Sequence, residues 1–326
     1  MCMPGPPCAG LLLSGRHPVP VYKRPMTNAA WEGRWVEVPG VGRLWSEARG
    51  PAAGPPVLLV MGAMNPGLVW PPGFVQALVA AGGRVIRYDH RDTGRSVQAA
   101  LSAPPCTLDD LAGDAVRVMD AWAVSRAAVV GWSMGGYIGQ LLARDLPQRI
   151  SHLVLLSSSG DHRPYLDGMM GRALRGTLPG PTPQLLAALW HLSAHASGMS
   201  ALDRAVQGWA VFHGGSHPFP EARVRGQMRE ALAQGHRPEL AAMRHALAVD
   251  AVAEPRLPWL PQLRLPTLVI HGAHDPALPL AHGQALADAI PGARLQVLDM
   301  GHLLPDALEG PAGEQVAGFI RLPGAG

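Results

Sequence analysis

The pentapeptide Gly131-Trp132-Ser133-Met134-Gly135 has the residue types and spacing of a nucleophile elbow. A serine hydroxyl is a weak nucleophile at neutral pH, so an enzyme that uses one presents it on a sharp turn beside a base and backbone donors. Glycines two residues before and after Ser133 permit that turn, because the neighbouring backbone comes too close for a Cβ atom. The alternative is a glycine-rich turn with an incidental serine. The apolar run 127–130 and the helix-like stretch 137–144 favour the elbow, since they supply the strand and the helix that it joins.

A serine that attacks a carbonyl needs a base to accept its proton, and the chain contains 14 histidines. His302 is the candidate, because it follows the predicted strand 294–298 in the turn Met300-Gly301-His302. Catalytic groups of an open parallel sheet collect at the carboxyl ends of its strands. A turn histidine that only packs is the alternative reading. Most of the other histidines lie between residues 161 and 261 and are expected to pack or to line the pocket, among them His191, His195, His213 and His217.

Asp275 is the candidate for the carboxylate that orients the histidine and stabilises its charged form. It ends the segment 268–275, just beyond a predicted buried strand, and Pro276 then turns the chain away. The order serine, acid, histidine along the chain is the one that an elbow of this kind uses. Asp161, which follows the preceding strand, and Asp299, which is near His302 in sequence, are weaker alternatives. Without a catalytic role, Asp275 would stabilise a loop.

A tetrahedral intermediate also needs donors for its oxyanion, and two backbone N–H groups are predicted to supply them. One is the N–H of Met134, directly after the serine. The other is the N–H of Ala63, in the loop that follows the predicted strand 57–60. An ordinary glycine turn is the alternative for that loop. Four residues beside these groups are predicted to contact the substrate: Met64, Asn65, Trp132 and Leu303.

The segment Tyr88 to Ser96 is dense in polar groups, but a structural role explains it better than catalysis. Asp, Thr and Gly in this order form tight turns through hydrogen bonds between side chains and backbone. We expect an ion network that holds the loop, formed by Asp89, Arg91, Asp92 and Arg95.

Short apolar runs that alternate with amphipathic stretches predict the elements that position these groups. The runs 57–60, 85–88, 127–130 and 153–156 are typical of parallel strands covered on both faces, and they alternate with helical patterns. The pattern resumes with strands at 266–270 and 294–298 and a final helix near 312–321. Two antiparallel strands, 35–38 and 42–48, precede it. The predicted fold class is therefore α/β, with a mostly parallel sheet flanked by helices.

Residues 161–261 have helical periods but no convincing strand, and they hold many Met, His and Trp residues. We predict a helical lid inserted at the carboxyl edge of the sheet, where such sheets bind ligands. The core would then comprise residues 31–160 and 262–326. Residues 1–30, rich in Pro and Gly at their start, are predicted to form a flexible extension.

Composition restricts the class of protein further. Hydrophobic residues make up 48% and charged residues 16%, which is typical of a globular protein. The net charge of +3 is spread along the chain without basic runs, so we expect neither a nucleic-acid nor a membrane partner. Cys2, Cys8 and Cys106 have no metal-ligand spacing, and no metal or cofactor is predicted. No apolar stretch approaches the roughly 20 residues of a membrane span, so we predict a cytoplasmic protein.

The chain resembles the α/β-hydrolase superfamily over about residues 31–323, and within it the lidded serine esterases. Four segments look like aclacinomycin methylesterase and its relatives: 58–62, 85–96, 266–276 and His282-Gly283. The resemblance implies a cofactor-free carboxylesterase that uses Ser133, His302 and Asp275. Two departures from the methylesterase, Ala63 in the place of a glycine and Trp132 in the place of a smaller aliphatic residue, predict an altered pocket entrance.

The predicted function is hydrolysis of small or medium, mostly apolar carboxylic esters through an acyl-enzyme, with methyl esters as one candidate class. A cofactor-free perhydrolase or haloperoxidase, and an amidase like proline iminopeptidase, remain alternatives on the same triad. Dehalogenases and epoxide hydrolases of this architecture place an aspartate where Ser133 stands. A non-catalytic binding module would need a broken triad, and all three members are present. The sequence leaves the oligomeric state open.

Overall fold

The computed structural model describes residues 30–100, 102–252 and 254–322. The predicted extension at residues 1–30 lies outside this part except for its last residue, and Cys2 and Cys8 lie outside it as well. The strands and longer helices are, in chain order, β1 (Glu32–Val38), β2 (Gly42–Arg49), β3 (Pro56–Val60), α1 (Pro72–Ala80), β4 (Arg84–Tyr88), α2 (Leu108–Ala121), β5 (Ala127–Trp132), α3 (Met134–Asp145), β6 (Ile150–Leu156), α4 (Arg163–Met169), α5 (Pro183–His195), α6 (Ala201–Ala210), α7 (Glu221–Ala233), α8 (Pro238–Asp250), β7 (Thr267–Gly272), α9 (Ala281–Ala289), β8 (Arg294–Leu298) and α10 (Asp306–Phe319).

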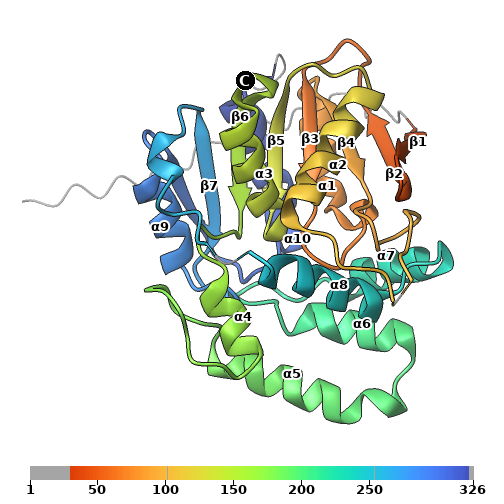
Figure 1. The fold of residues 1–326 in the computed structure, drawn as a ribbon, viewed down its shortest axis with the longest axis vertical. Coiled ribbons are helices and arrows are strands. Elements are labelled where there is room, and N and C mark those ends of the chain that lie inside the picture. Colours follow the sequence, from red (N-terminus) through yellow and green to blue (C-terminus); the bar gives the residue numbers. More distant parts are fainter. Residues whose placement is uncertain (1–29, 101, 253, 323–326) are drawn as a thin grey trace, which may run out of the picture.

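The strands form one sheet in the order β1-β2-β4-β3-β5-β6-β7-β8 (Figure 1). The pairs β1–β2 and β2–β4 are antiparallel, and the pairs from β4 to β8 are parallel. Parallel neighbours need crossover connections, and helices supply them. The α/β fold class predicted from the sequence is confirmed.

Two hydrophobic clusters cover the two faces of this sheet. On one face α1 and α10 pack together, and residues such as Phe74 and Val316 are fully buried there. On the other face α2, α3 and α9 supply residues such as Leu111 and Ile138. Every residue of β5 is buried. A central strand is covered by helices on both faces, and its sequence is therefore apolar almost throughout. The two layers of helices hold the strand ends at fixed positions.

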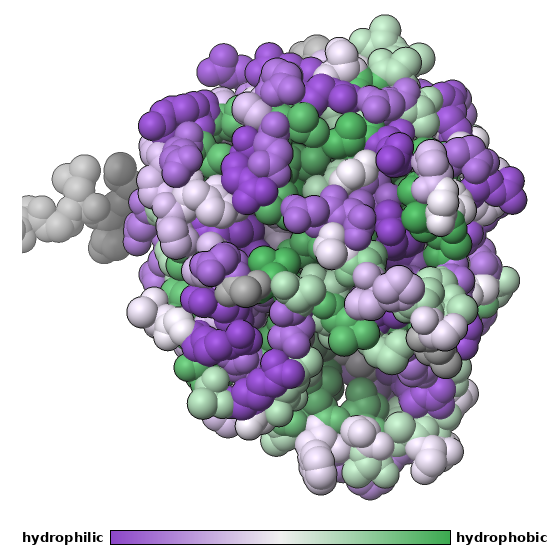
Figure 2. Space-filling model, in the orientation of Figure 1, coloured by the Kyte–Doolittle hydropathy of each residue, from purple (hydrophilic) through white to green (hydrophobic). Residues whose placement is uncertain are grey.

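Helices α4 to α8, between β6 and β7, lie together at one end of the sheet (Figure 1). No strand occurs between residues 161 and 261 among those that the structure describes. Hydrophobic side chains gather around a hollow at this end of the molecule (Figure 2). Most of the large hydrophobic residues that stay exposed belong to this segment: Met169, Met170, Leu174, Trp190, Met243 and Leu247.

The last helix begins earlier than the sequence predicts. The expected helix near 312–321 is observed as α10, which starts at Asp306 and contains Pro311. A proline near the start of a helix removes one backbone hydrogen bond without ending the helix. The acidic side chains of Asp306 and Glu309 stabilise the first turn, because they lie at the positive end of the helix dipole. Pro311 therefore lies inside the helix and not before its start. Among the described helices, none combines the length and the apolar character that crossing a bilayer requires.

Candidate active site

Ser133 lies between the end of β5 and the start of α3, and its backbone has a conformation that few residues adopt. Its φ of 53° and ψ of −117° place a non-glycine residue in a strained region. A Cβ atom added to Gly135 would lie 2.0 Å from the carbonyl oxygen of Val60, and one added to Gly131 would lie 2.3 Å from the carbonyl oxygen of Gly135. The Ser133 N–H donates to the carbonyl of Leu156 at 2.9 Å, which ties the turn to β6. The turn has the geometry that the two glycines predict.

His302 and Asp275 meet although 27 residues separate them along the chain. The His302 Nδ1 atom lies 2.8 Å from Asp275 Oδ2. The other carboxylate oxygen, Oδ1, accepts the N–H groups of Ala277 and Leu278, each at 2.9 Å. Burial by itself would raise the pKa of Asp275. The charge of His302 and its hydrogen bond lower this pKa by more than burial raises it, so the pKa lies below its ordinary value. An ionised Asp275 can accept a hydrogen bond from His302 Nδ1–H, which leaves Nε2 without a proton and available as a base.

Trp132, the variable residue of the pentapeptide, also contacts this histidine. Its indole Nε1–H donates to the backbone carbonyl of His302 at 3.0 Å. The ring is almost fully buried and packs against Trp70 and Trp209, with ring centroids 5.5 Å and 6.5 Å away. The residue before the serine therefore holds the backbone of the histidine.

The two alternative acids have other partners. Asp161 pairs with the guanidinium of Arg163, whose Nη2 lies 2.7 Å from Asp161 Oδ2. Asp299 accepts hydrogen bonds from Ser216 and lies 3.3 Å from His274 Nε2. Of the three carboxylates considered, the structure brings only Asp275 to His302.

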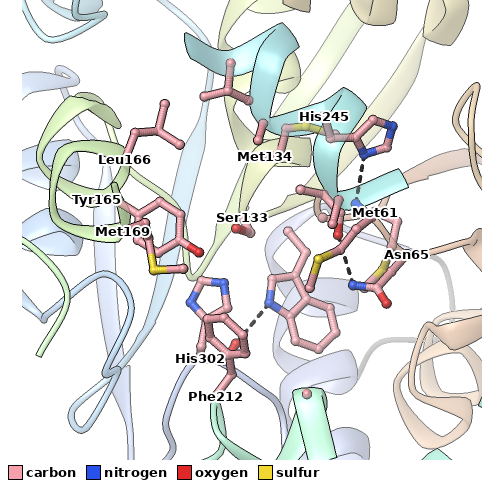
Figure 3. Close-up of a pocket in the computed structure, with 18 of the residues that line it drawn as sticks. Met61, Asn65, Ser133, Met134, Tyr165, Leu166, Met169, Phe212, His245 and His302 are labelled. Carbon is pink, nitrogen blue, oxygen red and sulfur yellow. Dashed lines mark hydrogen bonds between the residues drawn. The ribbon is translucent and has the colours of Figure 1, made fainter. Parts of the chain in front are cut away.

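Ser133 and His302 face a common cavity of about 390 Å³ (Figure 3). Among the described residues that line it, none is Asp, Glu, Lys or Arg. They are largely apolar, with five methionines and two tryptophans. All six residues predicted as oxyanion donors or substrate contacts line it: Ala63, Met64, Asn65, Trp132, Met134 and Leu303. Such walls suit an uncharged ligand, because an unpaired charge is costly to bury there.

The two predicted oxyanion donors come from neighbouring backbone segments. Met134 is the first residue of α3, so its N–H has no acceptor within the helix and lies at the positive end of the helix dipole. Ala63 belongs to the loop after β3, which lies against the elbow. A Cβ atom added to Gly62 would be 3.3 Å from the Cβ atom of Ser133. The oxyanion role of the two N–H groups stays a prediction.

Sequence reasoning did not name several residues of the cavity, most of them from the helical segment. Tyr165 of α4, His245 of α8 and Phe212, which follows α6, line it. The Tyr165 side chain points toward Ser133 and His302 in Figure 3. No motif in the sequence distinguishes these residues, because their positions depend on how the helices dock.

The four histidines expected to pack or to line the pocket do not line it. His191 and His195 are exposed on α5, where their rings stack on each other with centroids 4.2 Å apart, so the prediction is wrong for both. His213 packs against Phe219, and its Nε2 lies 2.8 Å from the carbonyl of His217. The pocket histidine from this segment is His245.

The loop after β4 is structural, as predicted, but its ion pairs have other partners. Asp89 accepts the backbone N–H groups of Gly67 and Arg95 at 2.7 and 2.9 Å. Arg91 pairs with Asp114 of α2, and Asp92 with Arg244 of α8. The predicted network among Asp89, Arg91, Asp92 and Arg95 is therefore wrong. The loop is fixed by neighbouring elements that a local reading of the sequence does not include.

Comparison with known proteins agrees with this geometry. A family model described as alpha/beta hydrolase fold matches residues 55–306. The chain belongs to the α/β-hydrolase family. This hydrolase is 38% identical over 287 residues to rhodomycin D methylesterase DnrP of Streptomyces peucetius and, equally, to rhodomycin D methylesterase DauP of Streptomyces sp. (strain C5). Each match covers 85% of this chain and 95% of the relative.

A solved structure supports the fold assignment. The crystal structure of a hydrolase from Pseudomonas aeruginosa PA01 superposes on this α/β-hydrolase with a TM-score of 0.64 at 25% identity. The superposition covers 90% of this chain and 98% of the other. With the methylesterase relatives, these matches confirm the predicted resemblance, and they identify the chain as an enzyme of the carboxylic-ester hydrolase class.

In the described part of this hydrolase, no group of three or more His, Cys, Asp or Glu side chains is placed to hold a metal ion. The expectation that neither metal nor cofactor takes part stays a prediction.

Proposed function

We propose that this α/β-hydrolase is a serine carboxylesterase that works through an acyl-enzyme. Ser133 attacks the ester carbonyl while His302 Nε2 accepts its proton and passes it to the leaving alcohol. Asp275 orients His302 and stabilises its imidazolium. Water, activated by His302, then releases the acid. The observation that carries the proposal is the 2.8 Å contact between His302 Nδ1 and Asp275 Oδ2, at a cavity that the strained Ser133 also lines.

The N–H groups of Ala63 and Met134 are proposed to bind the oxyanion of the tetrahedral intermediate. Both belong to the two backbone segments that meet at the elbow. Donors fixed in place before the reaction stabilise the developing charge without reorganisation.

The proposed substrates are uncharged, mostly apolar esters, contacted by Met64, Asn65, Trp132 and Leu303. The absence of charged side chains from the cavity wall supports this class. The names of the two methylesterase relatives make methyl esters the first candidates and favour ester hydrolysis over the perhydrolase and amidase alternatives. Tyr165 is added as a hydrogen-bond donor to the bound ester, since its hydroxyl points toward Ser133 and His302 (Figure 3).

Residues 161–261 are proposed to act as the lid over a core formed by 31–160 and 262–326. The cavity between them supports this division, because residues of α4, α6 and α8 form part of its wall. The cytoplasmic location and the lack of nucleic-acid and membrane partners stay predictions.

The test is Ser133→Ala. Removing the nucleophile is expected to lower kcat for p-nitrophenyl butyrate by more than about a thousandfold, as in other serine hydrolases. A fluorophosphonate probe should label the wild-type protein and not the variant. Circular dichroism and thermal unfolding verify that the variant is folded. A folded variant that hydrolyses the ester at the wild-type rate contradicts the proposal.

The same assay identifies the ester class. A panel that varies the acyl and alcohol parts separately, methyl esters included, is run with Ser133→Ala as the blank. Uncharged esters are expected to be hydrolysed faster than esters with a charged acyl chain of equal length. Equal rates for both would contradict the substrate class but leave the nucleophile unaffected.

A further inference from the structure

The loop after β3 carries one proposed oxyanion donor, and its backbone is strained next to that donor. Met64 has a φ of 60°, in the left-handed region that non-glycine residues seldom occupy. Strained residues persist only where surrounding contacts hold them. Those contacts bear on the orientation of the Ala63 N–H, one residue before.

His245 of α8 makes one of these contacts. Its Nδ1 accepts the N–H of Met64 at 2.8 Å (Figure 3), and its Nε2 lies 3.0 Å from the carbonyl of Arg91. A carbonyl only accepts hydrogen bonds, so Nε2 carries the proton and Nδ1 is the acceptor. The fully buried ring therefore joins the loops that follow β3 and β4. Burial also lowers the pKa of His245 and so favours this neutral form.

A second contact holds the other end of the same peptide group. The carbonyl of Ala63 accepts the Asn65 Nδ2–H at 2.9 Å, and Asn65 Oδ1 in turn accepts the Trp209 Nε1–H of α6 at 3.1 Å. The carbonyl and the N–H of the Ala63–Met64 peptide are thus both bonded. A flip of this peptide would break both bonds. The Ala63 N–H belongs to the adjoining Gly62–Ala63 peptide plane, so the two bonds restrict it through the Ala63 Cα atom that the two peptides share.

We propose that His245 is a positioning residue for the oxyanion hole, and that α6 and α8 hold the Ala63–Met64 peptide so that the adjoining Ala63 N–H stays directed at the oxyanion. The inference rests on the proposed function and adds to it. The helical segment then does more than cover the substrate: its docking completes the donor set. Nothing in this role requires His245 to touch the substrate.

Two substitutions of His245 separate the acceptor from the rest of the ring. In His245→Asn the side-chain oxygen can occupy the place of Nδ1 and accept the Met64 N–H, whereas His245→Leu removes the acceptor at similar size. His195→Leu, at an exposed histidine of α5, is the control. We expect His245→Leu to lower kcat/KM for p-nitrophenyl butyrate by about a hundredfold, near the lower end of the loss for a missing oxyanion donor. We expect His245→Asn to recover at least tenfold of that loss.

Inhibitor binding distinguishes positioning from a general loss of structure. An alkyl trifluoromethyl ketone forms a tetrahedral adduct with a serine and needs the oxyanion hole, whereas the matching methyl ketone binds mainly as a ground-state ligand. In His245→Leu the affinity for the fluorinated ketone should fall in proportion to kcat/KM, and that for the methyl ketone should stay within threefold. A kcat/KM of His245→Leu within threefold of wild type overturns the inference. The inference is also overturned if His245→Leu and His245→Asn lose kcat/KM equally, or if the affinity of His245→Leu for the fluorinated ketone is unchanged.

If His245→Leu does not fold, Trp209→Phe serves instead. It keeps an aromatic ring but removes the donor to Asn65, and should weaken the fluorinated ketone at least threefold more than the methyl ketone. Equal effects on both ketones overturn the inference. Failure of the proposed function is seen separately, because Ser133→Ala would then still hydrolyse the ester.

Discussion

At the scale of single residues, Trp132 links the proposed nucleophile to the proposed base. Its backbone precedes Ser133, and its indole N–H holds the carbonyl of His302 at 3.0 Å. The sequence predicts that Trp132 shapes the pocket, because it stands in the variable place of the elbow motif. That its polar atom is directed at the backbone of His302 depends on how two distant loops meet.

Trp132→Phe tests this contact. The variant keeps an aromatic ring but loses the donor, and a hydrogen bond of this kind contributes about 1 kcal/mol. We expect kcat to fall roughly five- to tenfold with a smaller change in KM, measured by ester hydrolysis at saturating substrate.

Trp70→Phe is the matched control for that measurement. Trp70 packs against Trp132, and its own buried Nε1 has no hydrogen-bond partner among the described residues. Its replacement should therefore leave kcat near the wild-type value. Equal losses of kcat in both variants would show that ring packing, not the hydrogen bond, matters.

At the scale of elements, a buried ion pair joins α8 to the loop after β4. Arg244 Nε lies 2.9 Å from Asp92 Oδ2, and both side chains are almost fully buried. The remaining guanidinium nitrogens donate to the carbonyls of Ala103 and Pro104, at 3.0 and 2.8 Å. Every polar end of the arginine is thus bonded, so the pair fixes the helix that carries His245.

Arg244→Leu is expected to lower the free energy of unfolding by about 3–5 kcal/mol, because it leaves the Asp92 carboxylate buried without its partner. Urea unfolding followed by circular dichroism measures this. Arg144→Leu, which breaks an exposed pair with Asp145, should cost less than about 1 kcal/mol. Similar losses in the two variants would contradict the special role of the buried pair.

The elements also differ in how well the sequence predicts them. Strands β3 to β7 are predicted within a few residues, because a strand covered on both faces must be apolar along its length. The start of the last helix is predicted less well: α10 begins at Asp306, six residues before the expected start near 312. The partners of Arg91 and Asp92 failed because each pairs with an element distant in sequence.

At the scale of the whole molecule, buried histidines make the fold sensitive to acid. Burial lowers the pKa of His90 and of His162 to about 3 and that of His236 to about 4. Between these values and 6.5 the unfolded chain binds protons that the folded protein does not, so stability rises with pH and is lost as pH falls. Asp89, whose pKa burial raises to about 6, opposes this between its ordinary value of 3.8 and 6.

We therefore expect the free energy of unfolding to be lower at pH 5 than at pH 7, with each of the three histidines contributing up to about 2 kcal/mol to the difference. Urea midpoints at the two pH values measure it. His236→Asn, which can keep the acceptor for the Gly94 N–H without titrating, should reduce the difference. Identical midpoints at pH 5 and pH 7 would contradict the prediction.

The sequence by itself determined the features that depend on local order. The elbow needs a strand, a tight glycine turn and a helix in succession, and the candidate acid and base each follow a strand end. These relations can be seen in the printed chain, because parallel strands bring their carboxyl ends to one edge whatever else the fold contains.

Only the tertiary structure decided which side chains complete the site. Tyr165, His245 and Trp209 come from helices whose docking on the sheet edge depends on many weak contacts between distant residues. No local sequence pattern predicts that docking, because helices of this kind have the same apolar periodicity whichever face they turn toward the cavity. The contacts that join Trp132 to His302, and His245 to the loop of Ala63, therefore cannot be predicted from the sequence and are seen only in the folded structure.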